Sequence, residues 1–208
     1  MKGIITKTND SQCYDGIDKI KNVYLQLLFK AILNVDEQYC HCQNPNKRIK
    51  GLYNHLERVF AYELYQQWSI LQCAYNDEVK DDYKRIVNGE IGKKMDNVTR
   101  FPDLVLHKGH EDLHNQEIVV EIKRRKWMRK NNIISDLDKI SKFMKRGFLS
   151  YGASEYKEGV FILIDGNEDD IKSQLVDIRN KISFNKRIYC VFCKGNKRLN
   201  YVTLNELL

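Results

Sequence analysis

Residues 159–165, "GVFILID", constrain the fold more than any other segment, because the run is apolar throughout rather than alternating. A short continuous apolar run is typical of a strand that is covered on both faces. The segment "RIYCVFC" at 187–193 predicts another buried strand. Strands covered on both faces require helices on both sides of the sheet, which favours an α/β fold.

Helical spacing of apolar residues supplies the covering elements. The predicted helices span residues 15–35, 53–75, 133–144 and 167–182. Shorter runs predict strands at 103–106 and 117–123, joined as a hairpin, and a short strand near 84–91. In chain order these elements predict a three-layer α/β architecture with a mixed central sheet flanked by helices.

The composition indicates one compact unit. Hydrophobic residues make up 42% of the 208 residues, which is enough for a substantial core. The chain has two prolines and no Gly/Ser-rich linker. Residues 1–50 are therefore expected to form an N-terminal helical extension on a main domain that covers residues 51–208.

The first residues, "MKGIITKTNDSQ", are too polar for a signal peptide, and no apolar run approaches the roughly 18 residues of a membrane span. The expected location is the cytoplasm, with no membrane partner. There the six cysteines are expected to be free thiols. Zinc binding by "YCHC" at 39–42 and "CVFC" at 190–193 is disfavoured, because residues three apart on a strand point to opposite faces.

Positive charge is concentrated in one window of the sequence. The formal net charge is +7 with a pI near 9.0, and residues 121–150 alone contain ten Lys or Arg and three Asp or Glu. Such an excess favours a polyanion as partner. A solvated helix face is the alternative interpretation of the same charge run.

Charged residues stand at the ends of the predicted hairpin strands. In "VVEIK", Glu121 and Lys123 share one face of the strand because they are two residues apart. Pro102 suits a strand start and places Asp103 there, and an antiparallel register exists that brings Asp103 beside Glu121. Adjacent carboxylates are stable together when a cation or proton lies between them, and their oxygens suit Mg²⁺ or Mn²⁺. A lysine beside them can position a water or stabilise a phosphate.

The "PD" at 102–103 and the "EIK" at 121–123 resemble the motif of the PD-(D/E)XK nuclease superfamily, which has the restriction-endonuclease-like fold. The resemblance covers residues 50–195 in the order of their elements. It implies that Asp103 and Glu121 ligate Mg²⁺ or Mn²⁺, that Lys123 is the catalytic lysine, and that the reaction is phosphodiester hydrolysis. It also implies a metal-binding glutamate on the helix before the "PD" strand.

Glu57 and Glu63 are the candidates for that helix glutamate. They are six residues apart, so their directions differ by roughly 240° around a helix. Glu63 borders the apolar face that contains Phe60 and Leu64, where a carboxylate is costly unless it is paired. Glu57 has the features of a surface residue. Glu63 is therefore the predicted third metal ligand, with Gln67 one turn later as possible support.

Basic residues after the "EIK" segment form the predicted nucleic-acid surface. The residues expected to contact phosphates are Arg124, Arg125, Lys126, Arg129, Lys130 and Lys139. Lys139 also resembles the additional basic residue that such nucleases carry on the helix after the second motif strand. DNA is favoured over RNA as the substrate, and duplex cleavage by this fold favours a homodimer.

The histidines His107, His110 and His114 form an HxxHxxxH pattern in the predicted hairpin loop. On a helix this spacing favours a zinc site, but in a loop it carries no such meaning. Metal binding by these three side chains is therefore disfavoured.

Three classes of function follow from the sequence. The first is a metal-dependent endonuclease. The second is a catalytically inactive protein of the same fold that binds nucleic acid or a protein partner. The third is a basic adaptor in which Asp103, Glu121 and Lys123 form a surface ion pair, which predicts no salt-dependent binding of nucleic acid.

Overall fold

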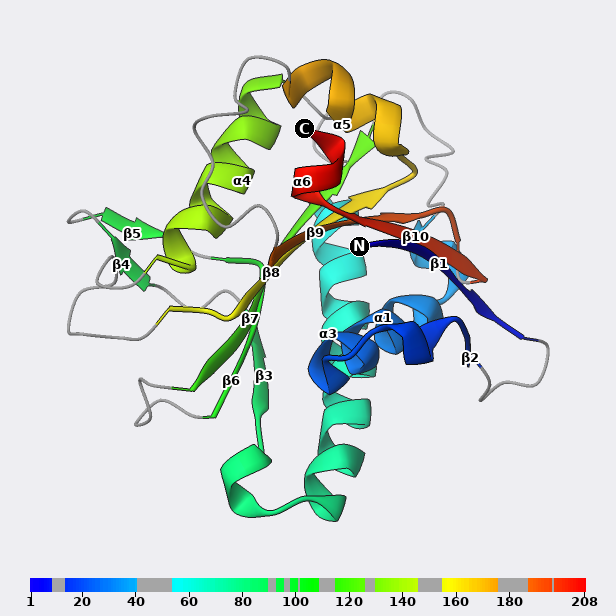
Figure 1. Cartoon of the computed structure of the whole chain (residues 1–208), viewed down its shortest axis with the longest axis vertical. Coiled ribbons are helices and arrows are strands. Elements are labelled where there is room, and N and C mark those ends of the chain that lie inside the picture. Colours follow the sequence, from blue (N-terminus) through cyan, green and yellow to red (C-terminus); the bar gives the residue numbers. More distant parts are fainter. Residues whose placement is uncertain are drawn as a thin grey trace.

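The chain folds around a mixed β-sheet with helices on both sides (Figure 1). The structure is a computed structural model. It describes residues 1–8, 14–40, 54–89, 93–95, 98–100, 102–108, 115–125, 130–145, 155–175, 187–195 and 197–208. This α/β class, with a mixed sheet flanked by helices, confirms the architecture expected from the sequence.

Eight strands form the main sheet. They are β1 (Lys2–Lys7), β2 (Tyr14–Asp15), β3 (Ile86–Gly89), β6 (Leu104–His107), β7 (Gln116–Arg124), β8 (Glu158–Ile164), β9 (Ile188–Cys193) and β10 (Arg198–Thr203). Their order is β2-β1-β10-β9-β8-β7-β6-β3, in which β7, β8 and β9 run parallel and the other neighbours run antiparallel. Strands β4 (Lys93–Met95) and β5 (Val98–Arg100) form a separate antiparallel ribbon.

The helices divide between the two faces of the sheet. They are α1 (Val23–Asn34), α2 (Glu37–Cys40), α3 (Asn54–Glu78), α4 (Lys130–Phe143), α5 (Glu168–Leu175) and α6 (Leu204–Leu207). Helices α1 and α3 lie on one side, and α4, α5 and α6 lie on the other (Figure 1). In the part of the chain that the structure describes, no helix is long and apolar enough to cross a membrane.

Strand β8 shows why its sequence is apolar throughout. Val160 and Ile162 pack in the core beneath α1 and α3, whereas Phe161 and Leu163 pack in the core beneath α4. Successive side chains of a strand point to opposite faces, so a strand between two helical layers buries every residue. The helices and strands predicted from the sequence are confirmed as α1, α3, α4, α5, β3, β6, β7, β8 and β9. The first helix was expected from residue 15 but begins at Val23, because the Asn22 side chain caps it there and Tyr14–Asp15 form β2. Residues 176–186, which include the end of the fourth predicted helix, lie outside the described residues.

Residues 1–50 were expected to form a helical extension, but Lys2–Lys7 of this segment form the strand β1. β1 pairs with β10 from Lys2 opposite Val202 to Thr6 opposite Arg198, so it belongs to the main sheet. Ile5 is the fully buried residue of β1. One buried side chain gives too weak an apolar pattern to predict a strand from the sequence. The strand forms because its backbone pairs with β10.

A buried ion pair fixes α3 at the end of the sheet opposite to the motif residues. Arg85 Nη2 lies 2.7 Å from Glu117 Oε1 on β7, and Lys157 Nζ lies 2.9 Å from the same oxygen. Asn76 of α3 accepts a hydrogen bond from the Arg85 N–H and donates one to the Arg85 carbonyl. The chain after α3 is thereby tied to β7, which sets the position of the helix along the strand.

The cysteines agree with the sequence analysis where the structure describes them. Cys190 packs beneath α4 and Cys193 beneath α1 and α3, so the two thiols lie on opposite faces of β9. Cys40, Cys73, Cys190 and Cys193 are free thiols, and Cys13 and Cys42 lie outside the described residues.

Candidate functional site

Strand β7 continues beyond the point where its neighbour β6 begins. The pairing between them ends where Leu104 lies opposite Val120, and β7 continues to Arg124. Extending the same antiparallel register by one residue places Asp103 opposite Glu121, which confirms the predicted hairpin register. On its other side β7 remains paired with β8 as far as Arg124, so this overhang is held in strand conformation.

Two carboxylates satisfy the backbone of the overhang. The Ile122 N–H donates to Asp103 Oδ2 at 2.7 Å, and the Arg124 N–H donates to Glu57 Oε1 at 3.0 Å. Amides two residues apart on a strand point to the same side, which here is the side that β6 has left. Asp103 and Glu57 therefore replace the missing strand, and the backbone itself positions both side chains.

The remaining charged groups form an alternating series. Lys123 Nζ lies 3.8 Å from Glu57 Oε2 and 3.6 Å from Asp136 Oδ2. Lys139 Nζ lies 3.7 Å from Asp136 Oδ1 and 2.6 Å from Glu121 Oε2. The series runs Glu57, Lys123, Asp136, Lys139 and Glu121, and it joins α3, β7 and α4 at one end of the sheet.

Glu121 is the most buried member of this cluster. Its side chain is fully buried, and among the described residues its Oε1 atom accepts no hydrogen bond. Burial raises the pKa of Glu121 well above its usual value, and the neighbouring Asp103 charge raises it further, whereas Lys139 opposes the shift. An ionised carboxylate in this position therefore calls for more positive charge than Lys139 supplies.

Burial also raises the pKa values of the carboxylates near Glu121. Burial raises the pKa of Asp103 against the effects of the Ile122 amide and Lys123, and burial likewise raises the pKa of Glu57. Burial alone would lower the pKa of Lys123, but the carboxylates of Asp136, Glu57 and Asp103 raise it overall. Lys123 is therefore a cation at neutral pH, suited to stabilising negative charge rather than to removing a proton.

The ionised cluster carries a net charge of −2. It contains the four carboxylates of Asp103, Glu121, Glu57 and Asp136 and the ammonium groups of two lysines. A divalent cation would balance this charge, and carboxylate oxygens are the ligands that Mg²⁺ and Mn²⁺ prefer. As the side chains stand, no group of three His, Cys, Asp or Glu among the described residues is arranged to hold a metal ion.

The helix carboxylate at the site is Glu57, which corrects the choice of Glu63. Glu57 lies seven residues before Leu64, so it shares the buried stripe of Phe60, Leu64 and Trp68 and extends it to the end of the sheet. Glu63 lies to one side of this stripe, where its Oε1 accepts a hydrogen bond from Gln67 of the same helix. Gln67 therefore supports Glu63 rather than the cluster.

Asp136 was not anticipated from the sequence. It lies three residues after Ile133 and four before Ile140, both fully buried, so it is on the inner face of α4. A carboxylate on an apolar helical stripe is the same signal that identifies Glu57. This signal could have been found by asking which acidic residues interrupt the buried stripe of each helix.

The predicted phosphate-binding residues fall into different environments. Arg124 is buried, and its guanidinium donates to Asp165 Oδ2 and to the Cys40 carbonyl, so its contacts are internal, in contrast to the prediction. Arg125 has a side chain that is 54% exposed and pairs with Asp170 at 3.0 Å. Lys139 belongs to the carboxylate cluster. Lys130 is the first residue of α4, and Lys126 and Arg129 lie outside the described residues.

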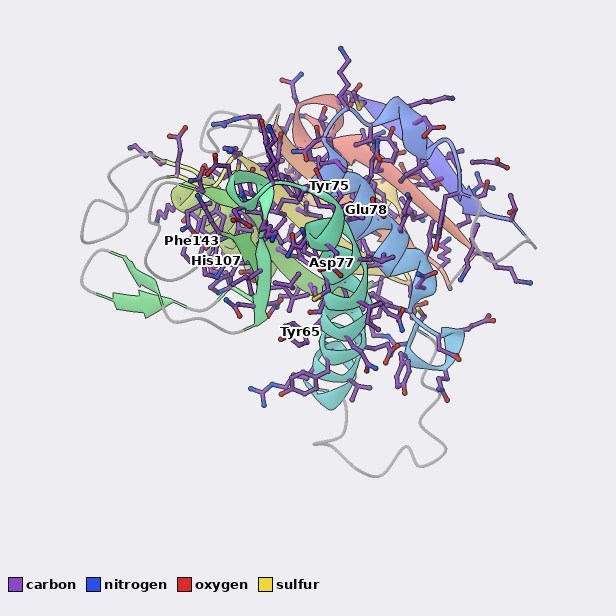
Figure 2. The ribbon with its side chains drawn as sticks, turned by 90° about the horizontal axis from the view of Figure 1, so that it is seen from below. Tyr65, Tyr75, Asp77, Glu78, His107 and Phe143 are labelled. Atoms are coloured by element: carbon purple, nitrogen blue, oxygen red, sulfur yellow. The ribbon has the colours of Figure 1, made fainter. Side chains whose placement is uncertain are left out.

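His107 lies at the end of β6 farthest from Asp103 (labelled in Figure 2). It is fully buried opposite Ile86 of β3, and its Nε2 atom lies 2.5 Å from the side-chain nitrogen of Asn88. His107 is therefore part of the packing between two strands. His110 and His114 lie outside the described residues.

The fold and the site together define an α/β protein with a carboxylate–lysine cluster at the carboxyl end of a strand. No protein-family model matches the chain, and comparison with curated proteins and with solved structures gives no match. The functional argument therefore depends on the geometry of the cluster.

Proposed function

We propose that the chain is a metal-dependent nuclease of the PD-(D/E)XK type, with a restriction-endonuclease-like core, that hydrolyses phosphodiester bonds in nucleic acid. The observation that carries the proposal is that Asp103, Glu121 and Lys123 come together at the end of β7, beyond its pairing with β6. These are the residues of the "PD" and "EIK" motifs, and the sheet order supports the resemblance, because the hairpin that bears them is followed by a helix and a parallel strand.

The side chains of Asp103 and Glu121 would hold Mg²⁺ or Mn²⁺, with Glu57 as the helix carboxylate beside them. Bound there, the metal supplies Lewis-acid activation of the phosphodiester and of a water molecule. Lys123, held as a cation by three carboxylates, stabilises the negative charge that develops on the phosphate. The backbone hydrogen bonds of Asp103 and Glu57 fix the position of the site before substrate binds.

DNA is the proposed substrate, and duplex cleavage would use a homodimer with one site for each strand. The basic window at 121–150 supports a polyanionic partner, because it contains ten Lys or Arg and three Asp or Glu in the sequence around the second motif. Arg125, which directly follows β7 and has a side chain that is 54% exposed, is a proposed phosphate contact and would have to leave its ion pair with Asp170 to make it.

One observation favours the alternative of a catalytically inactive protein of the same fold that binds nucleic acid or a protein. The Lys139 ammonium already forms an ion pair with Glu121. In addition, no three metal-binding side chains among the described residues converge. Under this alternative the two lysines are permanent counter-ions, and the chain binds nucleic acid in a salt-dependent manner without cleaving it.

Cleavage assays on plasmid DNA, single-stranded DNA and RNA in the presence of Mg²⁺ test the proposal. We expect cleavage by the wild type and its loss in Lys123→Ala, with the circular dichroism spectrum unchanged. Lys142→Ala is the matched control, because it removes the same charge from α4, where Lys142 pairs with Asp138 at 2.9 Å. Absence of cleavage by the wild type, together with absence of Mg²⁺ binding in calorimetry, would overturn the proposal.

A further inference from the structure

The ammonium group of Lys139 lies where a cation on Glu121 would be expected. Its Nζ atom is 2.6 Å from Glu121 Oε2, and the Lys139 side chain is only 16% exposed. Glu121 is fully buried, and its second oxygen accepts no hydrogen bond among the described residues. A buried carboxylate needs a positive partner, and in this state Lys139 is the partner in direct contact.

Lys139 also has a second acceptor within reach. Asp136 Oδ1 lies 3.7 Å from the same Nζ atom and three residues earlier on α4, so the two side chains share one face of the helix. A rotation about the flexible side-chain bonds of Lys139 can bring its ammonium closer to Asp136 and away from Glu121. The other oxygen of Asp136 lies 3.6 Å from Lys123, which keeps the carboxylate oriented between the two lysines.

We propose that Lys139 is an internal counter-ion that occupies the cation position on Glu121 until a divalent metal ion replaces it, and that Asp136 receives the displaced ammonium. This inference rests on the proposed function, because it assumes that Glu121 is a metal ligand. Lys139 is thus a positioning residue that sets the metal affinity of the site. The metal must compete with an ammonium already in place, so the wild-type affinity is lower than the carboxylates alone would give.

Titration of the protein with MnCl₂ in a calorimeter tests the competition without a cleavage assay. We expect Lys139→Met to bind Mn²⁺ with a dissociation constant at least about fivefold lower than that of the wild type, at the lower end of typical site-to-site coupling. Lys142→Met is the matched control, since it removes the same charge one turn later on α4, where Lys142 pairs with Asp138. An affinity in Lys139→Met equal to or weaker than that of the wild type overturns the inference.

Asp136→Asn provides a second measurement that does not depend on the stability of Lys139→Met. We expect it to weaken Mn²⁺ binding, because the displaced ammonium loses its acceptor. In the Lys139→Met background the same change should have much less effect, since no ammonium remains to be received. Equal effects of Asp136→Asn in both backgrounds contradict the role of Asp136.

The outcomes separate the two proposals. Equal Mn²⁺ binding by the wild type and Lys139→Met overturns the counter-ion role and leaves the nuclease proposal intact. Absence of Mn²⁺ binding in both overturns the counter-ion role and removes the metal site on which the nuclease proposal depends. Mn²⁺ binding by Lys139→Met alone would mean that the metal does not replace the ammonium in the wild type, which overturns the exchange and removes the wild-type metal site on which the nuclease proposal depends.

Discussion

Asp103 accepts a hydrogen bond from the Ile122 N–H at 2.7 Å, so one carboxylate both closes the overhang of β7 and faces the buried Glu121. The Oδ2 atom of Asp103 accepts the backbone hydrogen bond, while the negative charge of the carboxylate belongs to the proposed metal site. An asparagine side chain can accept the same hydrogen bond without the charge, which allows the two roles to be separated by mutation.

Asp103→Asn is expected to abolish Mg²⁺-dependent cleavage while the protein stays as stable as the wild type at pH 7, or becomes more stable by about 1 kcal/mol. The reason is that the substitution keeps the acceptor for Ile122 and removes the repulsion between Asp103 and Glu121. Asp103→Ala should lower the free energy of unfolding by about 1–3 kcal/mol, because the buried N–H loses its acceptor. Urea denaturation measures both, and equal stability of the two variants would argue against the structural role.

The two glutamates of α3 give a matched comparison. Glu57→Gln should lower the rate of DNA cleavage by about 10–100-fold, as expected for a residue that supports metal ligands. Glu63→Gln should leave the rate within about twofold of the wild type, because Glu63 bonds to Gln67 in its own helix. Rates at saturating Mg²⁺ decide the matter, and a larger loss in Glu63→Gln would restore Glu63 as the helix carboxylate.

The ion pair at the other end of α3 should affect stability. Arg85→Ala leaves the buried Glu117 carboxylate with Lys157 alone, so we expect the free energy of unfolding to fall by about 3–5 kcal/mol. Lys84→Ala is a suitable control, since Lys84 forms a solvent-exposed pair with Asp81 and its removal should leave the free energy of unfolding close to that of the wild type. A loss below 1 kcal/mol for Arg85→Ala would show that the buried pair does not anchor the helix.

Glu158 predicts a pH dependence that is separate from the motif cluster. Burial raises the pKa of Glu158 from 4.5 to about 7, against the lowering effects of Arg187 and Asn22. A raised pKa in the folded state means that the folded protein binds the proton more tightly than the unfolded chain. The stability that this group contributes is therefore complete below about pH 4.5 and is lost as the pH rises through 7.

Glu158→Gln should remove the loss of stability that accompanies ionisation of Glu158. Relative to the wild type, the variant should gain about 2–3 kcal/mol of unfolding free energy between pH 4.5 and pH 8. Glu78→Gln, at the exposed end of α3 (Figure 2), should follow the wild-type curve. Denaturation curves recorded at both pH values test the prediction, and identical pH dependence in the wild type and Glu158→Gln would refute it.

The positions of the strand residues of the site could be predicted from the sequence more accurately than those of the helix residues. Asp103 and Glu121 could be placed because strand alternation and an antiparallel register leave few choices. The choice between Glu57 and Glu63 depended on which helical face meets the sheet at its end, and that is decided by the packing of α3 as a whole. Asp136 depended in the same way on how α4 lies across β7.

Strand β1 also could not be predicted from its own sequence pattern. β1 buries Ile5 and depends on its partner β10 for backbone hydrogen bonds, so its own residues carry little strand signal. Tertiary pairing of this kind overrides local propensity.

The pairing of β1 with β10 has a consequence for synthesis of the chain on the ribosome. Lys2 lies opposite Val202, so β1 leaves the ribosome long before its partner strand β10 is available to pair with it. The hairpin that carries Asp103 and Glu121 joins residues close in sequence and can form much earlier. The site can therefore assemble on the nascent chain while the far edge of the sheet is still open to wrong partners, which makes β1 the expected point of vulnerability to aggregation during expression.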